Sequence, residues 1–319
     1  MCFEKLAVAF DSSVSVSSSL RRIQRFMADF VLDLDLMTKV IYAQIPKSDK
    51  VLLVLDRTNW KFGETNINIL MLGIAYKGVA FPLMFKMLSK FGNSSSDERI
   101  DLINRYIRLF GKDSIDCILA DREFVGKDWI DFLNQNRIRY HIRIRDNFWL
   151  EKPDDHSLIK VSWLFNQLKI NESTFLYKIW YIKGLACYLS ASKVLDKNGK
   201  PELQVLISFN KPEEALEYYK QRWQVESMFK AMKSSGFNIE NTHLTDLDRI
   251  TKLLVLVILT FTWVYLTGIE LNKLKPIRIL KHGRLAKSYF KHGLEAIAKI
   301  LNINNLNEFK FYANFLSCT

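Results

Sequence analysis

Two short apolar runs constrain the fold of this chain more than any other feature. Val51–Leu55 (VLLVL) and Cys117–Ala120 (CILA) are wholly apolar, and an aspartate follows each at once, Asp56 and Asp121. Runs of this length are typical of central strands that are buried on both faces. A carboxylate at the end of such a strand projects from the sheet edge where α/β proteins bind ligands and metals. Taken singly, each aspartate is also explained as a turn residue or a helix cap.

Between these two runs the sequence predicts a hairpin and a helix. Asn68–Tyr76 and Val79–Met87 are apolar runs separated by a Lys-Gly pair, which is typical of a β-hairpin. Ser95 and Glu98 form a capping box, and isoleucines follow at helical spacing. We therefore expect the strands and helices of an α/β protein to alternate here.

After Asp121 the pattern of apolar and polar residues changes twice. Arg137–Arg145 (RIRYHIRIR) alternates strictly, which predicts a half-buried strand whose cationic outer face is either solvated or follows a nucleic-acid backbone. From residue 146 to about 205, aromatic-rich stretches alternate with turn residues, which indicates a β-rich insertion. The chain reads as helical before residue 45 and again from Pro212.

The charge balance favours a polyanionic partner. The 319 residues carry 46 Lys and Arg against 34 Asp and Glu, a net charge of +12. Such a surplus suits nucleic acid first and an anionic membrane second, although a merely basic soluble protein also fits. Residues 271–319 hold nine Lys or Arg and two acids, so this basic tail is a candidate DNA-contact arm.

Cysteine usage and hydropathy indicate a protein without a disulfide framework, structural zinc or membrane anchor. Its four cysteines are widely spaced with no zinc-ligand spacing, which fits reduced thiols in a cytoplasm. The N-terminal MCFEKLAVAFDSS lacks the charged start and long apolar core of a signal peptide. Leu253–Leu266 is nearly all apolar but shorter than the roughly 20 residues of a membrane span, which favours a buried helix.

The stretch Tyr219–Lys233 (YKQRWQVESMFKAMK) holds one acid, Glu226, among four cations. On a continuous helix, Tyr219, Arg222, Glu226 and Lys233 fall within an arc of roughly 60° beside the apolar stripe. Arg222 and Glu226 also have the spacing of an ordinary surface ion pair. From this helix alone, a surface salt bridge and a functional site are equally good interpretations of Glu226.

Three carboxylates together favour the functional interpretation. Asp56, Asp121 and Glu226 are hard oxygen ligands of the kind that bind Mg²⁺ or Mn²⁺. Two such ions about 4 Å apart activate a water or a 3′-hydroxyl and stabilise the leaving oxygen in phosphoryl transfer.

The same residues carry a resemblance to a known family. LVLDRTNW around Asp56, CILADREFVGKDW around Asp121 and the spacing Tyr219-x2-Arg222-x3-Glu226-x6-Lys233 resemble the DDE transposases of bacterial insertion sequences. They are most similar to the subgroup with a Tyr-Arg-Glu-Lys signature. The resemblance covers roughly residues 20–319 and implies an RNase H-like mixed sheet with flanking helices, interrupted by the β-rich insertion. The expected parts are a helical N-terminal segment (1–45), the core's first part (46–145), the insertion (146–207), the core's second part with the Glu helix (208–270) and the basic tail (271–319).

The resemblance also implies roles for individual residues. Asp56 would bridge two Mg²⁺ or Mn²⁺ ions, and Asp121 and Glu226 would complete one metal site each. Three residues, Tyr219, Arg222 and Lys233, would grip phosphates near the cleaved transposon end. An aromatic of the insertion would stack on a flipped base; Trp163 and Trp180 are the candidates, and buried core is the alternative for both.

The resemblance implies an enzyme that cleaves double-stranded DNA at transposon ends and transfers the freed strand into target DNA. It also implies a bacterial cytoplasmic protein that acts as a homodimer on DNA and has no membrane partner. Relatives carry a longer region before the first aspartate, whereas 55 residues precede Asp56 here, so we expect a truncated DNA-binding region. Two alternatives stay open: an RNase H-like DNA nuclease that does not join ends, and a catalytically impaired DNA-binding remnant.

Overall fold

The chain folds into two compact units. The structure, a computed structural model, describes residues 3–10, 13–62, 64–233, 236–303, 311 and 313. The first unit comprises Met1–Pro46, Trp60–Ile67 and Phe229–Thr319, and the second comprises Lys47–Asn59 and Asn68–Met228. Both units therefore draw on distant parts of the sequence, and the β-strands belong mainly to the second.

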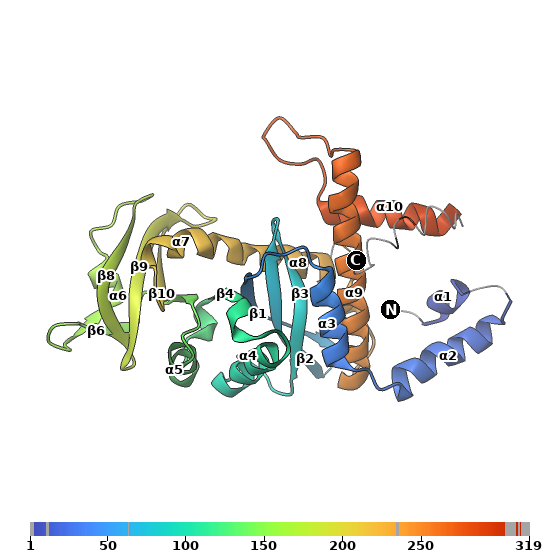
Figure 1. Cartoon of the computed structure of the whole chain (residues 1–319), viewed down its shortest axis with the longest axis horizontal. Coiled ribbons are helices and arrows are strands. Elements are labelled where there is room, and N and C mark those ends of the chain that lie inside the picture. The colour runs from blue at the N-terminus through green and yellow to red at the C-terminus, as the bar shows by residue number, and fades with distance from the viewer. Residues whose placement is uncertain are drawn as a thin grey trace. The chain divides into compact units, whose positions relative to one another are not determined.

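The strands form one ten-stranded sheet in the described part of the chain (Figure 1), in the order β3-β2-β1-β4-β5-β10-β9-β8-β6-β7. Their bounds are β1 (Val51–Phe62), β2 (Thr65–Tyr76), β3 (Val79–Leu88), β4 (Ile115–Ala120), β5 (Tyr140–Ile144), β6 (Trp149–Glu151), β7 (Leu158–Lys160), β8 (Ser173–Ile182), β9 (Leu185–Leu195) and β10 (Pro201–Ser208). The apolar runs in β1 and β4 are buried, and these strands pair in parallel up to Leu55 and Ala120. β5 continues the parallel ladder beside β4.

The predicted hairpin and capping box are both confirmed. β2 and β3 pair antiparallel around Lys77 and Gly78, whose positive φ angles of 47° and 85° suit a tight hairpin turn. Ser95 and Glu98 cap α4 (Ser96–Phe110) reciprocally. An antiparallel β1-β2-β3 meander followed by parallel β4 and β5 is the strand order of an RNase H-like core, so the expected fold class is confirmed.

The insertion is β-rich, as predicted, and it extends the core sheet. β10 pairs antiparallel with both β5 and β9, and β8 pairs with β9. A short helix, α6 (Val161–Leu164), follows β7. The part boundaries expected at residues 45, 145, 207 and 270 stay predictions.

The prediction that β5 is a half-buried strand, with a cationic outer face that is solvated or follows a nucleic-acid backbone, is wrong about the burial of the strand. Tyr140 and His141 point to opposite faces, and both side chains are buried. Tyr140 Oη donates to Asn134 of α5 (Lys127–Gln135), whereas the His141 ring lies edge-on to Tyr218 of α7 (Pro212–Lys220). Helices therefore cover both faces of β5. Arg139 is neutralised by Glu214 on α7, at 2.7 Å.

The first unit is helical. Its helices are α1 (Phe3–Val8), α2 (Val16–Asp29), α3 (Leu34–Gln44), the end of α8 (Gln224–Lys233), α9 (Leu247–Leu274) and α10 (Tyr289–Ile303). Among the described residues, α9 alone is long and apolar enough to cross a membrane, and 72% of its most apolar window is buried. A Cβ on Gly268 of α9 would lie 1.9 Å from the Tyr289 carbonyl oxygen, so glycine permits the close crossing of α10.

Candidate functional site

The two predicted aspartates lie on neighbouring strands of the second unit. Asp121 follows β4 and caps a 3₁₀ turn at Arg122–Phe124, where its Oδ1 accepts from the Arg122 backbone N–H at 2.8 Å. Asp56 lies where the ladder with β4 ends, but β1 continues to Phe62 because it also pairs with β2. The expectation that Asp56 ends its strand is therefore wrong, whereas its alignment with Asp121 is correct.

The stretch that carries Glu226 is not one continuous α-helix, which corrects the geometry assumed from its sequence. α7 ends at Lys220, a 3₁₀ turn spans Gln221–Trp223, and α8 begins at Gln224. A 3₁₀ turn within a helical run tightens the backbone and changes the direction of the side chains on it. Arg222 lies on this turn and is buried.

Arg222 joins two of the three predicted carboxylates. Its Nη1 lies 3.5 Å from Asp56 Oδ2, and its Nη2 lies 3.2 Å from Glu226 Oε1. The third carboxylate is held by Tyr219, whose Oη donates to Asp121 Oδ1 at 3.2 Å. Two signature residues therefore bind the three carboxylates in this structure, and the ion pair between Arg222 and Glu226 is present.

The electrostatics of this cluster follow from its burial. Burial raises the pKa of Asp56 to about 6, against the opposing effects of the Arg57 backbone N–H and of Arg222. Burial also raises the pKa of Tyr219, to which Asp121 adds. Burial lowers the pKa of Arg222, but its interactions with Tyr219, Asp121, Asp56 and Glu226, in that order, outweigh this effect and raise the pKa. The guanidinium is thus the positive centre of the cluster.

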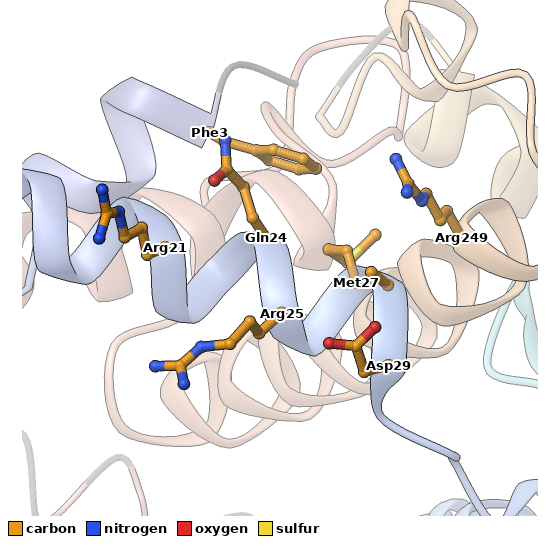
Figure 2. A pocket seen from close by; sticks show the side chains of 8 residues that line it. Phe3, Arg21, Gln24, Arg25, Met27, Asp29 and Arg249 are labelled. Atoms are coloured by element: carbon orange, nitrogen blue, oxygen red, sulfur yellow. The ribbon is translucent and has the colours of Figure 1, made fainter.

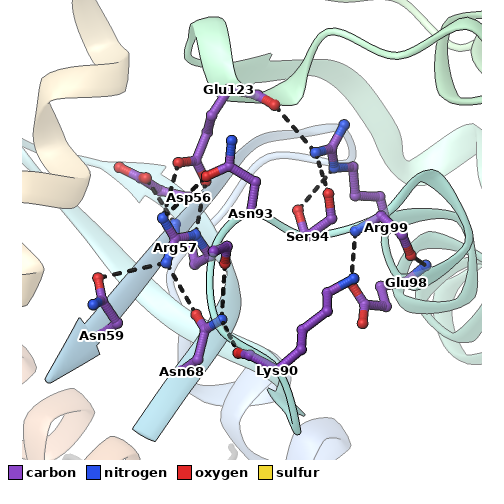
Figure 3. Close-up of polar contacts among 12 residues, drawn as sticks. Asp56, Arg57, Asn59, Asn68, Lys90, Asn93, Ser94, Glu98, Arg99 and Glu123 are labelled. Carbon is purple, nitrogen blue, oxygen red and sulfur yellow. Dashed lines mark hydrogen bonds and ion pairs between the residues drawn. The ribbon is translucent and has the colours of Figure 1, made fainter. Parts of the chain in front are cut away.

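A second ion pair connects the two aspartate-bearing segments (Figure 3). Arg57, directly after Asp56, donates from Nε to Glu123 Oε1 at 3.2 Å and from Nη2 to Oε2 at 3.3 Å. Arg57 Nη1 also donates to Asn68 Oδ1 at 3.1 Å. Arg57 and Glu123 were not predicted as site residues, although both lie inside the stretches that carry the resemblance. Their proximity to the aspartates was the available signal.

The Glu123 segment is fixed from its other side by a buried arginine. Arg99 of α4 donates from Nη2 to the Glu123 backbone oxygen at 3.1 Å and from Nε to Ser94 Oγ at 2.8 Å. Its guanidinium also lies over the Phe124 ring, 5.0 Å from the centroid. The loop after β4 is therefore held at Glu123 by two arginines, Arg57 and Arg99, two residues after Asp121.

The remaining predicted residues lie in different surroundings. Lys233, two turns after Glu226 on α8, belongs to the first unit, where it pairs with Glu240 at 2.7 Å and lies over the Trp60 ring. Trp163 is 62% exposed and meets Trp149 edge-on at 5.9 Å, whereas Trp180 is buried. Only Trp163 of the two tryptophans is therefore accessible to a base.

The three carboxylates have the oxygen ligands that a divalent cation prefers. In this structure, however, Arg222 lies between two of them, Asp56 and Glu226. The ranges described above contain no group of three or more His, Cys, Asp or Glu side chains at metal-binding spacing. Three oxygen donors nevertheless face one positive centre, and hard carboxylate oxygens are what Mg²⁺ and Mn²⁺ bind. Closing these donors around an ion requires Arg222 to release Asp56 and Glu226.

The RNase H-like strand order with carboxylates at adjacent strands defines a class of enzymes that act on nucleic acids. Within this class, the profile of the transposase DDE domain matches residues 47–263, more than half of the chain. The chain belongs to this family of transposase domains.

Other comparisons add little to the family match. No curated protein matches the chain significantly. Among solved structures, endonuclease V of Bacillus subtilis is 11% identical with a TM-score of 0.30, covering 79% of this chain and 96% of its own. The NurA nuclease of Sulfolobus solfataricus is 13% identical with a TM-score of 0.28, covering 76% and 94%. Both TM-scores are too low to establish a shared fold. The assignment of an RNase H-like fold to this chain rests instead on its strand order.

Proposed function

We propose that this protein is a bacterial insertion-sequence transposase of the Tyr-Arg-Glu-Lys subgroup that cleaves DNA at transposon ends and transfers the freed strand into target DNA. One observation carries the proposal: Asp56, Asp121 and Glu226 come from three distant segments and converge on Arg222 and Tyr219. Arg222 is buried and its partner Asp56 is only 19% exposed, and burying charged groups is costly for stability alone, which supports a functional role.

In this proposal the acidic residues bind metal ions, and the other residues bind the DNA and position it. Asp56, Asp121 and Glu226 would hold two Mg²⁺ or Mn²⁺ ions, and such ions supply Lewis-acid activation for phosphoryl transfer. Tyr219 and Arg222 would then exchange their carboxylate partners for the oxygens of the DNA phosphate, and Lys233 would add a further phosphate contact. The exposed Trp163 would stack on a base at the transposon end.

Two displacements at phosphorus account for the products. In the first, a water oxygen attacks the phosphorus at the transposon end, the P–O3′ bond breaks, and the 3′ oxygen leaves as a hydroxyl. In the second, this 3′-hydroxyl attacks a target phosphorus, a target P–O3′ bond breaks, and the target 3′ oxygen takes up the proton. Both steps need the same carboxylates, so one site serves cleavage and joining.

The partners follow from this activity. Double-stranded DNA would be bound both as transposon end and as target, in the cytoplasm of a bacterium and without a membrane. A homodimer would hold the paired ends. The net charge of +12 supports binding to DNA of any sequence.

The test is a strand-transfer assay with labelled terminal-repeat DNA, a target plasmid and Mg²⁺ or Mn²⁺. We expect Asp56→Asn, Asp121→Asn and Glu226→Gln each to lose at least ~1,000-fold in cleavage and joining. Asp128→Asn, an exposed acid in the first turn of α5, is the matched control and should retain activity. Full activity of the Asp121 variant would refute the proposal.

The fate of the DNA separates the two alternatives in the same assay. Cleavage whose 3′ ends are never joined indicates an RNase H-like nuclease. Salt-dependent DNA binding without metal-dependent cleavage indicates a DNA-binding remnant.

A further inference from the structure

Arg222 closes the carboxylate cluster of the second unit from within. Its side chain is only 7% exposed, and it contacts two acids, Asp56 with 19% and Glu226 with 47% of the side chain exposed. Nη1 bonds to Asp56 Oδ2, and Nη2 bonds to Glu226 Oε1. One guanidinium therefore occupies an oxygen on each of two segments that are far apart in the sequence.

Tyr219 closes the third acid in the same way. Its buried phenol donates to Asp121 Oδ1, an oxygen that also accepts from the Arg122 backbone N–H at 2.8 Å. The Tyr219 ring centroid lies 5.7 Å from the guanidinium carbon of Arg222, so the cation also contacts this ring. The ring packs in a small apolar cluster with Leu206 and Ala215. All three acids are thus held by two side chains that the protein core keeps in place.

The closed cluster keeps a negative charge. Three carboxylates face one guanidinium, because Tyr219 is a neutral donor and Arg57 is bound to Glu123. Three negative charges against one positive leave a net charge of −2. This charge attracts a divalent cation, but Arg222 and Tyr219 hold oxygens that the cation needs as ligands. Binding of the cation therefore has to displace bonds that already exist.

Arg222 has hydrogen-bonding capacity for a second anion. Among the described residues, its buried Nε has no hydrogen-bond partner. Nε and Nη2 form one edge of the planar guanidinium, and such an edge fits two oxygens of a phosphate. Nη2 is also the atom bound to Glu226, the more exposed of the two acids. A phosphate on this edge would therefore take the place of Glu226.

We propose that a DNA phosphate opens this cluster, so that divalent metal binds tightly to the carboxylates only when DNA is present. The inference rests on the proposed function in taking phosphodiester as the ligand of Arg222 and the three acids as metal ligands. When Nε and Nη2 bind phosphate oxygens, Glu226 is released and the long 3.5 Å contact with Asp56 loosens. Each ligand then raises the affinity for the other by the same factor. Without DNA, the protein is poorly loaded with metal.

The test is the affinity for Mn²⁺, measured from the electron paramagnetic resonance of the free ion, with and without DNA. The DNA is a pre-cleaved transposon-end duplex with no target, so neither cleavage nor joining takes place, and the Mn²⁺ bound by the duplex alone is subtracted. We expect DNA to tighten Mn²⁺ binding to wild type at least ~10-fold, and Mn²⁺ to tighten DNA binding by the same factor. Equal Mn²⁺ affinity with and without DNA would overturn the proposal.

Arg222→Gln separates opening of the cluster from direct contact between ion and phosphate. Without DNA, this variant should bind Mn²⁺ at least ~5-fold tighter than wild type, and DNA should add less than ~3-fold. If DNA still tightens Mn²⁺ binding as much as in wild type, the phosphate acts on the ions directly and the proposal is wrong.

Arg222→Lys is the second variant, and it carries the test if the Gln variant does not fold. It keeps the positive charge but lacks the fork that joins two acids, so its DNA-free Mn²⁺ affinity should lie between those of wild type and Arg222→Gln. Wild-type affinity and coupling in this variant would contradict the two-acid bridge. Thermal unfolding in EDTA shows which variants are folded.

Two other arginines supply matched controls. Arg143, whose charge acts on Tyr219 but which is bound to Glu202, tests the loss of a nearby positive charge. Arg25, an exposed side chain that lines an open cavity of the first unit (Figure 2), tests the loss of charge elsewhere. Arg143→Gln and Arg25→Gln should each change the DNA-induced tightening less than ~2-fold. A change as large as that in Arg222→Gln would overturn the proposal.

A small anion separates DNA from any tetrahedral oxyanion. Inorganic sulfate at matched ionic strength should tighten Mn²⁺ binding less than ~2-fold, and tightening equal to that by the duplex would overturn the assignment to DNA. Because nothing is cleaved, a failed strand-transfer assay leaves this result standing. Strand transfer without coupling would overturn the inference and leave the proposed function intact.

Discussion

Arg57 and Glu123 form a two-bond ion pair, with Nε–Oε1 at 3.2 Å and Nη2–Oε2 at 3.3 Å, between the segments that carry Asp56 and Asp121. The side chains are 14% and 23% exposed, so solvent screens the pair only partly. A planar guanidinium bound through two parallel bonds restrains orientation as well as distance. The spacing of the two aspartates therefore depends on this pair.

Breaking the pair should impair catalysis more than DNA binding. We expect Glu123→Gln and Arg57→Lys to lower kcat for cleavage about 10- to 100-fold, as is usual for residues that orient metal ligands, with little change in KM for DNA. The half-saturating Mn²⁺ concentration should rise in both, which a purely structural role would not produce. The exposed pair Lys178–Asp154 supplies the control Lys178→Gln. Equal Mn²⁺ dependence in all variants would contradict a positioning role.

Arg222 should compete with divalent metal for the carboxylates. Replacing it in Arg222→Gln leaves Asp56 and Glu226 without their cation, so Tm in EDTA should fall. Because an ion no longer has to displace the guanidinium, the rise in Tm with added Mn²⁺ should be larger than in wild type by at least ~3 °C. Lys220→Gln, from an exposed pair with Glu217, is the control. A smaller Mn²⁺ effect in the Arg222 variant would contradict the competition.

The two tryptophans of the insertion should behave in opposite ways. Trp180→Ala removes a buried side chain and should cost about 3–5 kcal/mol of unfolding free energy. Trp163→Ala should change stability by less than ~1 kcal/mol but weaken cleavage at the transposon end about 10-fold, through the loss of one stacked base. Fluorescence of 2-aminopurine placed at the terminal base measures the stacking directly. Unchanged fluorescence with the Trp163 variant would exclude this tryptophan.

The basic tail predicted from the sequence contains an ordered hairpin-like loop between α9 and α10. Arg278 O accepts from Ala286 N and Leu280 N donates to Arg284 O, both at 2.8 Å. Lys281 and Arg284 are exposed, and the sequence holds no acid between Glu270 and Glu295. We expect Lys281→Gln/Arg284→Gln to reduce the salt slope of DNA binding by about 2. Lys273→Gln, whose lysine pairs with Glu270, should leave the slope unchanged.

Local signals predicted this fold better than distant contacts did. The capping box at Ser95 and the turn at Gly78 depend on residues within four positions, so the sequence contains all the information. The carboxylates were predictable because two of them follow apolar strands. The pair of Arg57 with Glu123 was not, because 66 residues separate the partners.

The errors have a common physical cause. The alternation in β5 predicts a solvated face only if nothing covers it, but the acid that neutralises Arg139, Glu214, lies 75 residues further on. The 3₁₀ turn at Gln221–Trp223 contains no glycine or proline, so no residue of the turn predicts it from the sequence. It coincides instead with the contact of Arg222 with Asp56, 166 residues away. Tertiary contacts thus decided both features.

Buried His141 should make the protein sensitive to acid. Burial lowers its pKa to about 3, with Arg139 adding to the effect, and its Nδ1 lies 2.7 Å from Ser208 Oγ. Because this pKa is below the roughly 6.5 of an unfolded histidine, the stabilising contribution is complete above pH ~6.5 and is lost progressively as pH falls toward 3. At pH 4.5 the loss of unfolding free energy should be about 3 kcal/mol.

We expect His141→Gln to be less stable than wild type at pH 7.5 but to lose less unfolding free energy on acidification, measured by urea unfolding at pH 7.5 and pH 4.5. His156→Gln, at an exposed histidine, should follow wild type, and parallel losses in all three proteins would contradict the assignment.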